Sequence, residues 1–275
     1  MKYVTIKKVK IAYKTIGRGK AILILHGFSL DHRVMKTCLE PIFGKLSKRN
    51  EKFRRIYIDL PGMGKSQSGK KVTSADKMLE ILLKFIKRMF GKKKFLVIGY
   101  SYGAYLIRGI LHHLNEQIDG MVMFCPVVIA DQKRRTLPKR SVAEKNSVLA
   151  RQVKRHGDEK EIAVFNTLVI QNKQIWKRCK QEILSSMRLC DPFTIKAMEK
   201  KYSYTFEKEL NDSCSKPVLV IVGKGDGIVG YEDAQKLMKR YSNGSFVILN
   251  KAGHNLQIEQ PRMFSTLIVD WQRKF

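Results

Sequence analysis

The chain has 275 residues, 44% of them hydrophobic, which suffices for one large core or for one core with a sizeable insertion. Its apolar runs are short, and none approaches the roughly 20 residues that a membrane-spanning helix needs. Lys and Arg number 54 against 24 Asp and Glu, a formal net charge of +30 that favours polyanions, but no zinc-finger spacing or RNA-recognition signature predicts a specific nucleic-acid partner.

The first half of the chain alternates strand-like and helix-like segments. Two alternating runs, 2–6 and 9–16, predict an opening antiparallel hairpin, and the continuous apolar run 21–27 predicts a strand covered on both faces. The pattern then predicts a helix over about 33–46, a strand over 54–60, a helix over 74–90, a strand over 94–100, a helix over 102–114 and a strand over 119–127. This rhythm predicts a mostly parallel sheet in an α/β fold.

The rhythm breaks after Pro126. Residues 131–215 are polar and helical, with expected helices at 141–155, at 159–187 and from Asp191-Pro192, where Asp caps and Pro occupies the first turn. Strand-like runs return at 216–226 and 244–254, with helices expected at 231–241 and 259–275. We therefore expect one core, formed by residues 1–130 and 216–275, with residues 131–215 inserted as a helical cap.

Cysteines and the N-terminus indicate the compartment. Five cysteines, with no CxxC pair, fit neither a disulfide framework nor a zinc site, so reduced thiols are expected. The first 17 residues alternate apolar and basic side chains and contain no apolar signal core. We expect the protein to be cytoplasmic.

The string Gly99-Tyr100-Ser101-Tyr102-Gly103 lies where a predicted strand meets a predicted helix. A sharp strand-to-helix turn leaves no room for side chains on either side of its central residue, and glycine meets that need. A serine alcohol is a weak nucleophile unless a base reaches it and a third group orients that base. Ser101 is therefore a candidate nucleophile only if the chain supplies those partners.

Candidate partners follow the last two predicted strands. His254 lies in a loop before the closing helix, and Asp226 follows the strand before that in a glycine-rich segment. Asp131, after the sixth predicted strand, is an alternative acid. The order Ser101, Asp226, His254 is that of the α/β-hydrolase triad and differs from the orders in chymotrypsin and subtilisin.

Four collinear segments resemble the α/β-hydrolase fold superfamily in its capped form: "LILHGF" (23–28), "DLPGMGKS" (59–66), "GYSYGA" (99–104), and "VGKGDGIVG" (222–230) with "AGHNLQIEQP" (252–261). The resemblance implies a mostly parallel eight-stranded sheet flanked by helices, with a helical cap after strand 6. It also implies a triad of Ser101, Asp226 and His254, and an oxyanion hole made by the backbone N–H groups of Phe28 and Tyr102. His26 is expected to hydrogen-bond within its turn.

The resemblance implies a serine hydrolase that cleaves a carboxylic ester or related acyl bond of a small to medium substrate, without a cofactor or metal. Thioesterase, C–C hydrolase, aminopeptidase and perhydrolase chemistry, or a non-catalytic basic binding protein, are alternatives. Phe165, Trp176 and Phe193 of the insertion are candidate substrate-binding residues. Family members often have a proline shortly after the acid, whereas this chain reads Ile228-Val229-Gly230, which predicts a looser loop.

Overall fold

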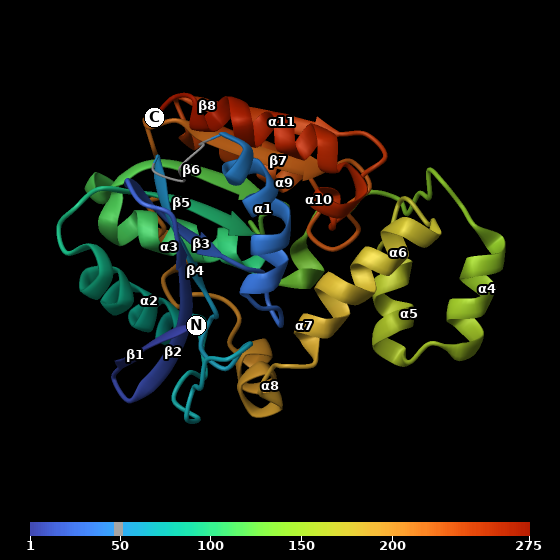
Figure 1. Ribbon diagram of the computed structural model, residues 1–275, viewed down its shortest axis with the longest axis horizontal. Coiled ribbons are helices and arrows are strands. Elements are labelled where there is room, and N and C mark those ends of the chain that lie inside the picture. The colour runs from blue at the N-terminus through green and yellow to red at the C-terminus, as the bar shows by residue number, and fades with distance from the viewer. Residues whose placement is uncertain (47–51) are drawn as a thin grey trace.

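The computed structural model describes residues 1–46 and 52–275, and it is built on one eight-stranded sheet (Figure 1). The strand order is β1-β2-β4-β3-β5-β6-β7-β8. The strands are β1 (Lys2–Ile6), β2 (Val9–Ile16), β3 (Lys20–Leu25), β4 (Phe53–Ile58), β5 (Phe95–Tyr100), β6 (Ile118–Phe124), β7 (Val218–Gly223) and β8 (Gly244–Leu249). The β1–β2 and β2–β4 pairs are antiparallel and all later pairs are parallel, which confirms the predicted hairpin and the mostly parallel sheet.

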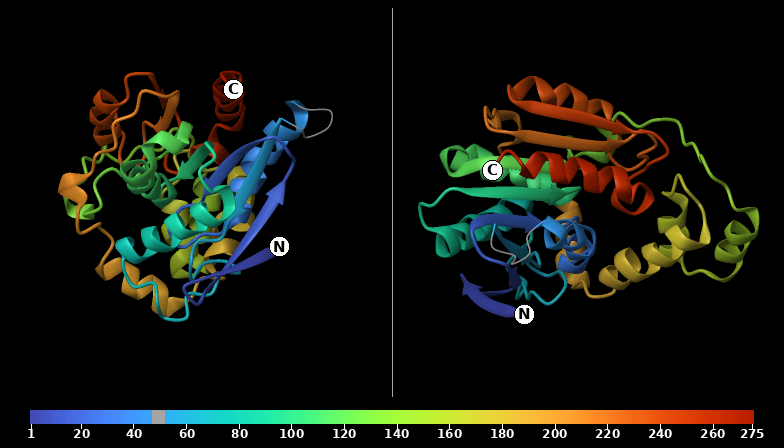
Figure 2. Two further views of the ribbon diagram at one scale, coloured as in Figure 1. Left: turned by 90° about the vertical axis from the view of Figure 1, so that its left-hand side faces the viewer. Right: turned by 45° about the horizontal axis from the view of Figure 1, so that its top comes forward.

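Central strands are apolar along their whole length because helices cover both faces of the sheet. Every residue of β5 and β7 is buried, so these strands show the continuous apolar runs of a sheet covered on both sides. Helices α1 (His32–Leu46) and α11 (Pro261–Gln272) contact each other on one face. Helices α2 (Ala75–Phe90) and α3 (Tyr102–Leu114) contact each other on the other face (Figure 2).

The local sequence explains where the longest helix begins and ends. The Ser74 hydroxyl accepts a hydrogen bond from the amide of Lys77 at the start of α2, and Gly91 ends the helix with a φ of +60°. Between these caps the buried side chains of α2 recur at three- and four-residue spacing, as in an amphipathic helix lying on a sheet. The other α2 face remains open to solvent.

A helical insertion follows β6, as expected, but its helices are shorter than predicted. They are α4 (Ser147–His156), α5 (Glu159–Asn166), α6 (Lys173–Cys179), a π-helical turn (Lys180–Leu184), α7 (Ser185–Met187) and α8 (Pro192–Lys200). The start of α8 is as predicted, with Asp191 as its cap. Helices α4 to α6 extend away from the sheet (Figure 1). The division of the chain into a core and a cap at residues 131 and 215 stays a prediction.

The predicted helices over 141–155 and 159–187 are wrong in extent because a distant carboxylate holds an extended segment between α5 and α6. The two oxygens of Glu259, in α10 (Leu256–Glu259), accept hydrogen bonds from the amides of Val169 and Ile170 and from that of Gly253. Ile170 also bridges to Glu144 ahead of α4. Because the amides of Val169 and Ile170 donate to Glu259 and not to carbonyls of a preceding helical turn, the helix does not continue through these residues.

Within the residues that the structure describes, no helix combines the length and the apolar character that crossing a bilayer requires.

Candidate active site

Ser101 occupies a strained turn between β5 and α3. Its φ of +53° and ψ of −113° lie outside the regions that residues with a Cβ ordinarily adopt. The flanking glycines are sterically required, because a Cβ on Gly103 would lie 2.4 Å from the carbonyl oxygen of Leu25, and one on Gly99 would lie 2.6 Å from Ile107. The turn thus sets the Ser101 hydroxyl at the end of β5, where it is only 7% exposed.

Ser101, His254 and Asp226 form one chain of hydrogen bonds. The Nε2 atom of His254 lies 3.0 Å from the Ser101 Oγ, and its Nδ1 atom lies 2.9 Å from Oδ2 of Asp226. Asp226 is fully buried, and His254 lies in the loop after β8. A carboxylate accepts but cannot donate, so it favours the imidazole tautomer with its proton on Nδ1. That tautomer leaves Nε2 as an acceptor facing the serine.

The loop that carries Asp226 is held firmly although it lacks the proline expected from the family pattern. The second carboxylate oxygen of Asp226 accepts hydrogen bonds from the amides of Ile228 and Val229, at 2.9 and 3.0 Å. The guanidinium of Arg135 donates to the carbonyl of Ile228, and also to the carbonyls of Ile129 and Ala130 in the loop after β6. Arg135 therefore joins this loop to the loop after β6, and the looser loop stays a prediction.

The alternative acid, Asp131, takes no part in the hydrogen bonds that connect Ser101, His254 and Asp226. Asp131 is exposed at the rim of the site, and its carboxylate accepts a hydrogen bond from the amide of Lys133. Asp226, in contrast, lies directly behind His254. The geometry favours Asp226 as the partner of the imidazole.

Phe28 and Tyr102 lie on either side of the turn, with their rings 5.5 Å apart in an edge-to-face arrangement. A Cβ on Gly27 would lie 3.3 Å from the Cβ of Ser101, so the chain after β3 passes close to the serine. Among the backbone hydrogen bonds of residues 1–46 and 52–275, none uses the amide of Phe28 or of Tyr102 as donor. Neither amide therefore has a recorded backbone acceptor among these residues, and the oxyanion hole stays a prediction.

His26 is a structural residue of the turn after β3. Its Nδ1 atom lies 2.7 Å from the carbonyl oxygen of Gly27, and its Nε2 atom accepts the amide proton of Leu60 at 2.9 Å. Burial lowers the pKa of His26 below its ordinary value of 6.5, so the ring stays neutral. A neutral imidazole with both nitrogens engaged is not free to act as a base.

Two groups of side chains have the composition of a metal site. Cys125 joins Asp226 and His254 in one group, and Asp31, His32 and Asp59 form the other. Burial raises the pKa of the Cys125 thiol well above its ordinary value, so it is a poor ligand.

In the second group, one oxygen of Asp59 accepts hydrogen bonds from the amide and the Nδ1 of His32, and Arg33 forms an ion pair with Asp31. Both groups are explained by hydrogen bonds within the protein.

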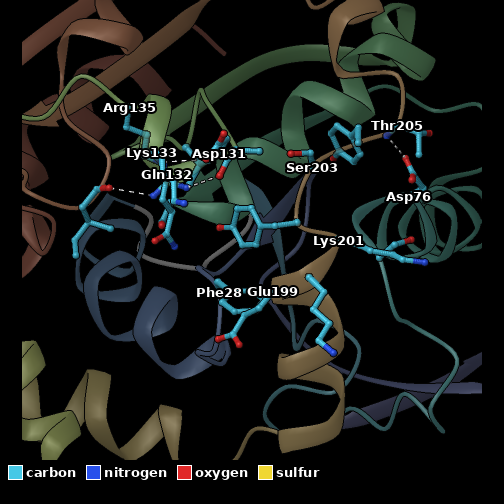
Figure 3. A pocket seen from close by; sticks show the side chains of 18 of the residues that line it. Phe28, Asp76, Asp131, Gln132, Lys133, Arg135, Glu199, Lys201, Ser203 and Thr205 are labelled. Carbon is cyan, nitrogen blue, oxygen red and sulfur yellow. Dashed lines mark hydrogen bonds between the residues drawn. The ribbon is translucent and has the colours of Figure 1, made fainter.

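Ser101 lines a cavity of about 950 Å³. Figure 3 shows the side chains around this cavity, among them Phe28 and Arg135. Phe28 and His254 lie beside the serine, and the loop at 127–135 forms one wall. The other wall is the segment 199–205, which consists of the last two residues of α8 and the chain after them, and so belongs to the insertion. This segment is fixed to α2, because the amide of Ala75 donates to the carbonyl of Lys201 and the amide of Thr205 donates to Asp76.

The three aromatic residues predicted to bind substrate lie elsewhere. Phe165 and Trp176 are buried and pack edge to face, with ring centroids 5.3 Å apart, inside the insertion. Phe193 is 47% exposed and borders a separate hollow beside Lys70. None of the three is among the described residues that line the Ser101 cavity. A role of these residues in substrate binding therefore has no support from the lining of this cavity and stays a prediction, because helical periodicity marks apolar residues without showing what they pack against.

Sequence reasoning missed Tyr202 and Arg135, which both line the cavity. The Tyr202 ring packs against Phe28 and Tyr102, at centroid distances of 5.3 and 4.7 Å. Tyr202 lies in an irregular segment between predicted elements, so periodicity gave no signal for it. The run of aromatic residues at 202–206 was the available clue.

Comparisons with known proteins identify the family and agree with the fold. The family model described as alpha/beta hydrolase fold matches residues 20–261. The crystal structure of an alpha/beta superfamily hydrolase from Oenococcus oeni PSU-1 superposes with a TM-score of 0.83 and 33% sequence identity, covering 99% of this chain and 100% of that one.

More distant relatives carry names of lipases and esterases. The monoacylglycerol lipase ABHD6 of Bos taurus is 21% identical over 98% of this chain and 81% of its own length. The pimeloyl-[acyl-carrier protein] methyl ester esterase of Shewanella woodyi is 22% identical over 95% of this chain and 97% of its own. A thermophilic esterase from Thermogutta terrifontis shares the fold, with a TM-score of 0.70 and 23% identity over 100% of this chain and 99% of that one.

Proposed function

The chain belongs to the alpha/beta hydrolase fold family, and we propose that it is a serine hydrolase that cleaves a carboxylic ester or related acyl bond of a small to medium substrate. The observation that carries this proposal is the hydrogen-bonded chain from Asp226 through His254 to Ser101, at the head of a cavity. Distant relatives named as lipases and esterases support ester bonds as the substrate class.

In the proposed reaction, Nε2 of His254 takes the Ser101 proton while Oγ attacks the carbonyl carbon. The carbonyl electron pair moves onto oxygen, and the amides of Phe28 and Tyr102 donate hydrogen bonds to that oxyanion. Asp226 keeps the imidazole in its tautomer and stabilises the imidazolium. When the carbonyl reforms, His254 passes its proton to the leaving alkoxide, and an alcohol departs from the acyl-enzyme.

Deacylation, the second half of the reaction, repeats these steps with water as the nucleophile. His254 removes a proton from the water, hydroxide adds to the acyl carbon, and Ser101 leaves with the proton that His254 returns. Each oxyanion-hole amide lowers the barrier by about 3–4 kcal/mol in well-studied hydrolases. These amides are fixed by the fold, so no reorganisation is needed during the reaction.

A substrate panel tests the proposal and its chemical alternatives. The wild type and Ser101→Ala are compared on p-nitrophenyl esters of increasing acyl length, thioesters, lactones and aminoacyl amides. The proposal predicts ester turnover that Ser101→Ala loses. Turnover confined to thioesters or to aminoacyl amides would replace the ester assignment, and a folded wild type inactive on every compound would favour a binding protein.

A further inference from the structure

Three hollows on the protein surface differ in charge from the candidate active site. Strand β1 and helix α2, which border two of them, lie on the side of the molecule away from helices α4 to α6 (Figure 1). One hollow lies between β1 and α2, and a second lies between α2, the turn after it and the end of α3. The third is bordered by the turn between β2 and β3 and by the turn after α2. Together they are lined by ten Lys and Arg residues and by one acidic residue, Glu80. The Ser101 cavity, in contrast, is lined by four basic and three acidic residues. The three hollows are thus far more basic than the cavity at the candidate site of chemistry.

Most of these cations are not neutralised within the protein. Glu80 is already paired with Lys7 and Lys77, and Asp119 with Lys20 and Lys94. Six further cations line the hollows, are exposed, and form no ion pair with any residue that the structure describes. We call them the α2 basic face: Arg18, Lys84, Lys87, Arg88, Lys92 and Lys93.

The face combines these cations with apolar side chains. In the hollow between α2 and the end of α3, the half-buried Leu83 and Leu114 lie beside Lys84, Lys87 and Lys92. The neighbouring hollow shares Lys84 and Lys87 and reaches the apolar side chains of β1. A surface of this kind offers phosphate-binding groups at its rim and apolar contacts at its floor.

We propose that the α2 basic face docks on a membrane surface that carries anionic phospholipids. The phosphate groups of such lipids match the six cations, and the glycerol and upper acyl carbons match Leu83 and Leu114. Single-stranded nucleic acid needs exposed aromatic rings on which bases stack, and the hollow between α2 and α3 has no Phe, Tyr or Trp among its described lining residues. This inference does not depend on the proposed hydrolase activity.

Two triple variants of equal net charge distinguish the effect of the protein's net charge on vesicle binding from the effect of where the lysines lie. One variant, Lys84→Glu/Lys87→Glu/Lys92→Glu, reverses three cations of the face. The matched control, Lys145→Glu/Lys154→Glu/Lys173→Glu, reverses three exposed lysines of the insertion. Each protein is sedimented with vesicles of phosphatidylcholine alone, or mixed with phosphatidylglycerol, at physiological salt, where charges beyond about 8 Å are screened.

We expect wild type and the control to bind the mixed vesicles, and neither to bind phosphatidylcholine alone. Because each basic residue near an anionic surface contributes about 1 kcal/mol, the face variant should partition roughly 100-fold less. An equal loss of vesicle binding in both triple variants would show that only the net charge matters, and would overturn the assignment of the α2 basic face as the docking surface. Displacement of wild type from the mixed vesicles by duplex DNA at the same salt would assign the face to nucleic acid instead. Circular dichroism of both variants verifies folding.

Discussion

The guanidinium of Arg135 donates a hydrogen bond to the carbonyl of Ile228, at 3.0 Å, and thereby holds the residue whose amide binds Asp226. The same guanidinium bonds two carbonyls of the loop after β6. Arg135 therefore connects the two loops on either side of the proposed triad. Arg135 thus restrains the loop of Asp226 in a chain that has no proline there.

Replacing Arg135 with alanine is predicted to lower kcat/KM for ester hydrolysis by roughly 10- to 100-fold, because small displacements of a catalytic group are costly. The secondary structure should be retained. Arg135→Lys, which cannot reach three carbonyls at once, should fall between alanine and wild type. The matched control is Arg134→Ala, which removes the exposed neighbouring arginine. Equal activity of both alanine variants would contradict a positioning role for Arg135.

Tyr102 is predicted to act through its backbone alone. Its hydroxyl is buried and has no hydrogen-bond partner in the part of the chain that the structure describes. Tyr102→Phe removes an unsatisfied polar group while leaving the amide in place, so activity should be unchanged and the melting temperature equal or higher. Steady-state kinetics and thermal unfolding measure the two outcomes. A large loss of kcat would show that the hydroxyl takes part in the reaction.

The core could be predicted from sequence because its determinants are local. The limits of α3 at Tyr102 and Leu114 agree with the prediction, since Gly99 and Gly103 mark the turn and an apolar run follows it. The chain order of the candidate triad is also visible in the sequence, because each residue follows a recognisable strand, although only the strands before Ser101 and Asp226 are buried along their whole length.

The insertion could not be predicted in the same way because its form depends on contacts that are distant in sequence. Glu259 breaks the expected long helix from about 90 residues away. Similarly, apolar side chains at Phe165 and Trp176 are expected both in a substrate pocket and in the interior of the insertion. Only the fold shows that the two rings pack against each other. Tyr202 lines the cavity from an irregular segment that carries no periodicity.

Glu259 is predicted to be a main stabilising contact between the insertion and the loop of His254. Its carboxylate accepts hydrogen bonds from three buried amides, those of Val169, Ile170 and Gly253. Glu259→Ala leaves these donors without a partner and should lower the free energy of unfolding by about 2–4 kcal/mol. Urea denaturation measures the change, with the exposed Glu209→Ala as control. Equal stability of the two variants would contradict this assignment.

The buried His26 predicts a pH dependence of stability. Burial lowers the pKa of His26 in the folded protein below 6.5, so between that pKa and 6.5 the unfolded chain binds more protons than the folded one. The free energy of unfolding should therefore fall as the pH drops below 6.5, by up to about 1.4 kcal/mol per pH unit from this group.

His26→Asn keeps a donor and an acceptor but cannot titrate, so it should lose this part of the slope. The control, His156→Asn, changes an exposed histidine and should retain it. Urea denaturation at a series of pH values gives both slopes. An unchanged slope in His26→Asn would show that other groups cause the acid sensitivity.

Covalent labelling shows whether Ser101 is a nucleophile activated by His254. Wild type, Ser101→Ala and His254→Ala are treated with a fluorophosphonate, and the intact mass and the labelled peptide are measured. We expect one adduct on Ser101 in wild type, none in Ser101→Ala, and labelling slowed by several orders of magnitude in His254→Ala. A folded wild type that takes no label, or a label on another residue that persists in Ser101→Ala, would contradict it.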